Sequence, residues 1–153
     1  MIEFALLAPA FFLGVLGLLV LGLFVLNDVE LSDGVRDGAR AGGICGSQLF
    51  VASTSAVLPN GQQCSMDHLV SYIQGRIQTI PGVTPSISVD FSGGQCSTAT
   101  PCSATTCQVG QKIRVTASYP QPLMVPLIGN FWGDPGNTGV RTINANAEGT
   151  CEQ

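Results

Sequence analysis

The stretch FALLAPAFFLGVLGLLVLGLFVL, residues 4–26, decides the architecture of this 153-residue chain. Its 23 residues include no charged or hydrogen-bonding side chain, and 19 of them are apolar, the exceptions being Pro9, Gly14, Gly17 and Gly22. A helix of that length rises roughly 34 Å, and the hydrocarbon core of a bilayer is about 30 Å thick. Because a surface helix of a soluble protein would carry a polar face, the segment predicts a membrane-spanning helix.

The flanks distinguish this segment from a secretory signal peptide. The apolar region of a signal peptide is typically about 7 to 15 residues long, follows basic residues and precedes a small-residue cleavage site. Here the charge before the span is Glu3, and the first charges after it are Asp28, Glu30 and Asp33. Since neither flank has the basic excess of a cytoplasmic side, we expect that a basic leader preceded Met1 and has been removed.

Residues 27–43 are expected to continue the same helix as an amphipathic stalk. Two pairs of opposite charges lie three residues apart on it: Asp33 with Arg36, and Asp37 with Arg40. Such pairs stabilise an exposed helix face modestly. The Gly42-Gly43 pair predicts the end of the helix. We therefore divide the chain into an N-terminal helix over residues 1–44 and a head domain over residues 45–153.

Three glycines form a stripe on the stalk. Gly34, Gly38 and Gly42 recur at four-residue steps, so they lie on one face of the helix. A stripe of small residues lets another backbone approach closely. The partner is either the sheet of the same chain or a neighbouring subunit, and the sequence leaves both alternatives open.

The head has the segment pattern of a small α+β fold with an antiparallel sheet. Its short segments are separated by Gly, Pro, Ser and Asn. We expect a strand or irregular extension over 49–58, one short helix over 66–80 capped by Ser65 and ended by Pro81-Gly82, and strands over 87–91, 113–119 and 140–148. The apolar stretch 119–132 would either cover the sheet or present a patch to a neighbour.

Composition and cysteine spacing limit the kinds of binding site and cross-link that this chain can contain. Only 10% of residues are charged and the net charge is −4, so no basic face for nucleic acid is expected. Without a Cys-x-x-Cys pair, and with His68 as the one histidine, no metal site is expected. The cysteines are even in number and all follow the apolar segment: Cys45, Cys64, Cys96, Cys102, Cys107 and Cys151. We predict three disulfides, with fifteen possible pairings.

No catalytic constellation emerges from the sequence. Ser65, Asp67 and His68 are close in sequence, but at a helix start their side chains point to different faces, and capping explains Ser65 better than a triad does. Phosphate-binding loops, zinc-protease motifs and dinucleotide fingerprints are absent from the sequence. We expect no enzyme activity and no cofactor.

The head of the chain resembles a known family. Met1-Ile-Glu-Phe-Ala-Leu-Leu-Ala-Pro9, the apolar run, and Val35-Arg-Asp-Gly-Ala-Arg-Ala41 are similar to the N-terminal helix of the TadE-like pilins of tight-adherence (type IVc) pili. The segments 112–120 and 141–148 resemble the two late strands of that family. The resemblance implies a structural subunit that a prepilin peptidase processes and that dedicated pilus assembly machinery polymerises with identical subunits into an extracellular filament.

Two other functions fit the same sequence pattern. One is a minor pseudopilin that acts in pilus assembly, and the other is an adhesin held by a permanent single-span anchor. In each case the subunit would first lie in the cytoplasmic membrane with its head outside. Abundance in surface filaments separates the structural subunit from these alternatives.

Three residues near the N-terminus, Met1, Glu3 and Pro9, are expected to act in assembly. A carboxylate within an apolar helix is costly and usually marks a partner, so we predict that Glu3 accepts the α-amino group of Met1 from a neighbouring subunit. Pairing of these two groups within one chain is the alternative. Pro9 lacks a backbone donor, so we expect a kink near residues 5–10 once the helix leaves the bilayer.

Overall fold

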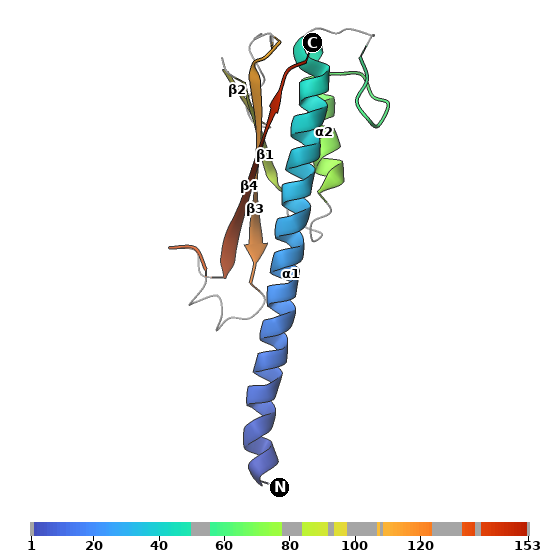
Figure 1. Cartoon of the computed structure of the whole chain (residues 1–153). Coiled ribbons are helices and arrows are strands. Elements are labelled where there is room, and N and C mark those ends of the chain that lie inside the picture. The colour runs from blue at the N-terminus through green and yellow to red at the C-terminus, as the bar shows by residue number, and fades with distance from the viewer. Residues whose placement is uncertain are drawn as a thin grey trace. The chain divides into compact units, whose positions relative to one another are not determined.

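The structure is a computed structural model, and it describes residues 2–49, 56–77, 84–91, 94–97, 107, 109–123, 133–136 and 139–152. In these ranges the elements are the helices α1 (Ile2–Cys45) and α2 (Met66–Arg76), the 3₁₀ turn η1 (Gly46–Leu49), and the strands β1 (Ser86–Phe91), β2 (Gly94–Ser97), β3 (Lys112–Pro122) and β4 (Val140–Thr150) (Figure 1). The predicted α+β class, with a long N-terminal helix and one further short helix, is confirmed.

Helix α1 runs for 44 residues without interruption, and Pro9 lies inside it. The isolated chain therefore has no helix break at residues 5–10, and the kink expected after the helix leaves the bilayer stays a prediction. The expected end at Gly42-Gly43 is wrong by two residues, since the helix continues to Cys45. Gly43 lies inside the helix, and the backbone of Thr150 packs closely against it.

The sheet has the strand order β2-β1-β3-β4. Strands β1 and β3 pair antiparallel, with Val89 opposite Val115. The predicted alternation is confirmed in both strands, because every second side chain is buried. Strand β2 was not predicted: the sequence Gly-Gln-Cys-Ser lacks the alternating β-branched residues of a strand, and it pairs antiparallel with β1 through its backbone.

The described chain forms two compact units, one from Met1–Asp28 and Pro120–Ile143, the other from Val29–Tyr119 and Asn144–Gln153. Helix α1 belongs to the first unit up to Asp28 and to the second from Val29 onward. The stalk of α1 thus packs within the second unit, and the division of the chain at residue 44 stays a prediction.

The core of the second unit forms between α1, α2 and the sheet. On α1, Leu31, Val35 and Ala39 are buried, and on α2 Leu69 and Ile73 are fully buried. Because these positions recur at four-residue steps, each helix presents one apolar face. The apolar periodicity of the sequence indicated the α2 face correctly.

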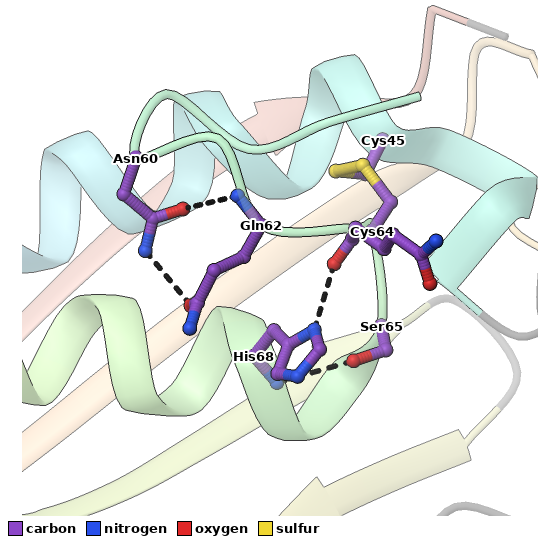
Figure 2. Close-up of a disulfide and its surroundings, with 7 residues drawn as sticks. Cys45, Asn60, Gln62, Cys64, Ser65 and His68 are labelled. Carbon is purple, nitrogen blue, oxygen red and sulfur yellow. Dashed lines mark hydrogen bonds between the residues drawn. A yellow bond between two sulfur atoms is a disulfide. The ribbon is translucent and has the colours of Figure 1, made fainter. Parts of the chain in front are cut away.

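Helix α2 starts where the sequence predicted and ends earlier. The Ser65 hydroxyl accepts the backbone N–H of His68 at 3.2 Å, so the predicted cap is confirmed (Figure 2). The ring Nδ1 of His68 lies 3.0 Å from the Gln63 carbonyl oxygen. The helix ends at Arg76 rather than residue 80, because Ile77 has an extended backbone. The expected stop at Pro81-Gly82 lies outside the described residues.

Two of the expected disulfides are present in the described part of the chain. Cys45 at the end of α1 is bonded to Cys64, just before α2 (Figure 2). Cys107 is bonded to Cys151, which follows β4. Cys96 lies in β2, and Cys102 lies outside the described residues. If all six cysteines are oxidised, the remaining bridge joins Cys96 to Cys102.

Tryptic mapping of the non-reduced protein tests this pairing. Cleavage after the basic residues places Cys45 and Cys64 in one peptide, 41–76, and leaves Cys151 in peptide 142–153. We expect one disulfide within peptide 41–76 and one that joins peptide 142–153 to peptide 77–112. A third disulfide, between Cys96 and Cys102, should lie within peptide 77–112. Alkylation of any cysteine before reduction would contradict full oxidation. Loss of one bridge should destabilise the head by roughly 2 to 5 kcal/mol.

Candidate assembly surface

The N-terminal part of α1 exposes a continuous set of large apolar side chains. Leu7, Phe11 and Leu18 are each about two-thirds exposed or more, at 68%, 69% and 71%. Other exposed members of the set are Phe12, Leu13, Val15, Leu16, Leu19, Leu21, Leu23, Val25, Leu26 and Val29. Soluble proteins rarely leave such an apolar surface in water, so it requires lipid or protein partners.

The length and composition of α1 allow it to cross a membrane. Among the described residues, Leu7–Cys45 contains a window with a mean hydropathy of 2.6, none of which is buried by the rest of the chain. A buried core helix can be equally apolar, but its side chains would be covered. The exposed apolar part therefore agrees with the membrane helix predicted from residues 4–26.

A polar contact lies at the residue that follows the apolar run of α1. Asn27 is buried, and its side-chain amide donates a hydrogen bond to the buried side-chain oxygen of Gln121. Both residues lie in the first compact unit. Because a buried amide is costly without a partner, this pair fixes where the segment around Gln121 meets the helix. No local pattern indicates this pair, since the two residues are far apart along the chain.

The glycine stripe faces the head of the same chain. An added Cβ at Gly34 would lie 2.6 Å from Ile77, one at Gly38 would lie 2.5 Å from Ile73, and one at Gly42 would lie 2.5 Å from Ile113. Of the two alternatives, packing within the chain accounts for these contacts. Gly34 and Gly38 face residues at α2 rather than the expected sheet, and Gly42 faces β3 of the sheet. A role of these glycines in contacts between subunits stays a prediction.

The charged flank of the stalk pairs differently from the prediction. Asp33 and Arg36 lie 3.9 Å apart, as predicted. Asp37 pairs with Arg76 of α2 at 3.8 Å, so the predicted pair with Arg40 is wrong. Arg76 reaches Asp37 from a neighbouring helix, and sequence spacing along α1 alone cannot indicate such a partner.

The remaining predicted assembly residues lie at the tip of α1. Glu3 is in the first turn of the helix and Pro9 in its third, and Met1 lies outside the described residues. The pairing predicted for Glu3 therefore stays a prediction. In the described part of the chain no three His, Cys, Asp or Glu side chains gather as a metal site.

The chain thus combines one exposed apolar helix with a small disulfide-bonded α+β head. The family model described as TadE-like protein matches residues 1–40, which confirms the resemblance read from the sequence of the helix. No curated protein and no solved structure matches the chain.

Two carboxylates, Glu148 on β4 and Asp134 before it, have lowered pKa values. Hydrogen bonds from Arg114 and then Lys112 lower the pKa of Glu148 below its ordinary value of 4.5. The Arg114 Nε atom lies 3.0 Å and the Lys112 Nζ atom 3.3 Å from a Glu148 oxygen. The hydroxyl and backbone N–H of Thr142 likewise lower the pKa of Asp134.

These shifts predict loss of stability in acid. A carboxylate whose pKa is lower in the folded state than in the unfolded state stabilises the fold fully at a pH above its unfolded-state pKa. This contribution to stability is lost as the pH falls through the folded-state pKa. The unfolding midpoint should therefore decrease below about pH 4, and Glu148→Gln should make the decrease smaller. Thermal unfolding at several pH values measures this. Glu152→Gln, which removes an exposed carboxylate outside this cluster, is the control, and an equal effect of both variants would contradict the assignment.

Proposed function

We propose that this chain is a structural pilin subunit that polymerises through α1 into an extracellular filament of the tight-adherence type. Before assembly, α1 holds the subunit in the cytoplasmic membrane with its head outside. During assembly, the helices leave the lipid and pack against one another in the filament core. A prepilin peptidase and the pilus assembly machinery would process and polymerise the subunit.

One observation carries the proposal: the large apolar side chains that α1 exposes between Leu7 and Val29 all lie within residues 1–40, which match the TadE-like family. Lipid covers the exposed apolar residues of a transmembrane helix. Identical helices can take the place of that lipid by van der Waals packing against one another. The head is stabilised independently by its own core and by disulfides, so it can remain folded in both environments.

Electron microscopy and intact-mass analysis of sheared cell-surface material test the proposal. If the chain is the structural subunit, it is the main protein of the filaments, and its mass shows leader removal and oxidised cysteines. A chain that stays in the membrane while filaments form without it in quantity would instead indicate a minor pseudopilin. A chain that remains a membrane protein in cells without any filament would indicate an anchored adhesin.

A further inference from the structure

We propose that the pocket beside Arg141 binds the headgroup of an anionic phospholipid at the membrane surface. The pocket lies in the first compact unit, where the ends of β3 and β4 meet the apolar helix. The inference rests on the membrane-inserted stage of the proposed function. It adds a lipid partner that polymerisation by itself does not require.

The pocket lies beside about the last two turns of the apolar run of α1, which ends at Leu26. Its walls are Val20, Leu21 and Phe24 of α1, Leu123 after β3, and Arg141 near the start of β4, and they enclose about 120 Å³. All five residues belong to the first compact unit. The pocket therefore joins an apolar lining to one guanidinium group, which is the combination that an acyl chain and its anionic headgroup require.

The length of α1 that precedes the pocket places the pocket at the bilayer surface. The 18 residues of α1 before Val20 span roughly 27 Å, close to the thickness of a hydrocarbon core of about 30 Å. Asn27 is buried against Gln121 and Asp28 is exposed, so the helix beyond this level carries polar groups that lipid would disfavour. The apolar run 4–26 thus ends within about two turns of the pocket, so Arg141 lies beside the outer end of the inserted segment.

Charge favours an anion at this position. Arg141 is the only Lys or Arg in the ranges that form the first unit, and its side chain is 44% exposed. Among the described residues its ion-pair partner is Asp134, which has an oxygen 4.0 Å from the Arg141 Nη1 atom and accepts hydrogen bonds from Thr142. A guanidinium group has five N–H donors, so Arg141 retains donors for a phosphate group.

The acyl chain has an apolar path from the pocket into the bilayer. Leu16 and Leu13 precede Val20 by four and seven residues, so they continue the same face of α1, and both are exposed. A free phosphate ion would gain nothing from this face. The apolar continuation therefore favours a phospholipid over a soluble phosphate as the occupant.

Native mass spectrometry of the full chain in nanodiscs tests the proposal, with equal amounts of phosphatidylglycerol and phosphatidylcholine. Flotation of vesicles first confirms that the chain is inserted, and failure at this step would count against the proposed function instead. We expect the released protein to retain phosphatidylglycerol about fivefold over phosphatidylcholine, the effect of one basic residue at an anionic surface. Arg141→Gln should abolish the preference.

Two further variants separate the site from general charge effects. Arg36→Gln removes the same charge from the stalk in the second unit and should leave the preference unchanged. Asp134→Asn removes the competing carboxylate but keeps an oxygen for Thr142, so it should increase the preference and stays informative if Arg141→Gln is unstable. Equal lipid retention by the wild type and Arg141→Gln would overturn the proposal. Displacement of the lipid by millimolar inorganic phosphate would also overturn it, since the site would then recognise phosphate alone.

Discussion

Glu3→Ala is expected to eliminate filaments while leaving the amount of subunit in the membrane nearly unchanged. The reason is the position of one carboxylate at the tip of a helix that is otherwise uncharged up to Leu26. In a dry filament core, a carboxylate and a newly freed α-amino group would each be costly alone, and each satisfies the other when paired. Removal of the carboxylate leaves the amine of Met1 buried and unpaired, with a penalty on the order of 3 to 5 kcal/mol per contact.

Filament yield and membrane abundance should be measured side by side in Glu3→Ala, Glu3→Asp and the wild type. Glu3→Asp keeps the charge but shortens its reach, so its filament yield should be intermediate. In the membrane, the tip of the helix lies near water, where a carboxylate is hydrated and the substitution has little effect. Normal filament yield from Glu3→Ala would mean that Glu3 is an interfacial residue without a role in assembly.

The features that the sequence predicted well are those that a local pattern determines. The apolar run that ends at Leu26 has no polar side chain with which to form a soluble surface, so a long exposed helix is its consistent outcome. The alternation around Val89 and Val115 identified two half-buried strands, and Ser65 identified the start of α2. In each case the signal lies within a few residues of the structure that it predicts.

The features that the sequence missed depend on partners far away along the chain. Periodicity showed that the glycine stripe has a partner, but the contacts were needed to identify Ile73 and Ile113 as that partner. Charge spacing predicted that Asp37 would pair along α1, whereas Arg76 reaches it from α2. The pocket beside Arg141 combines a helix and two strand ends, so no single stretch of sequence contains its pattern.

The close approach of α1 and β4 predicts the largest loss of stability from a single methyl group. An added Cβ at Gly149 would lie 2.6 Å from the carbonyl oxygen of Ala39, and one at Gly43 would lie 2.6 Å from that of Thr150. Both obstacles are backbone atoms, which cannot turn aside as the end of a side chain can. The Glu152 backbone N–H also donates to the Gly43 carbonyl at 3.0 Å, which holds the two segments together.

Gly149→Ala should therefore destabilise the head by about 1 to 3 kcal/mol, the usual cost of overpacking. Gly43→Ala should cost less, because alanine is favoured over glycine in a helix by about 1 kcal/mol. Gly75→Ala in α2 is the matched control: its Cβ would meet nothing within 4 Å, so the helix preference should make it neutral or slightly stabilising. Pulse proteolysis of the full chain in mild detergent ranks the three variants. If Gly149→Ala proves as stable as Gly75→Ala, β4 does not contact α1 through their backbones, and the head must be held by its apolar side chains and disulfides alone.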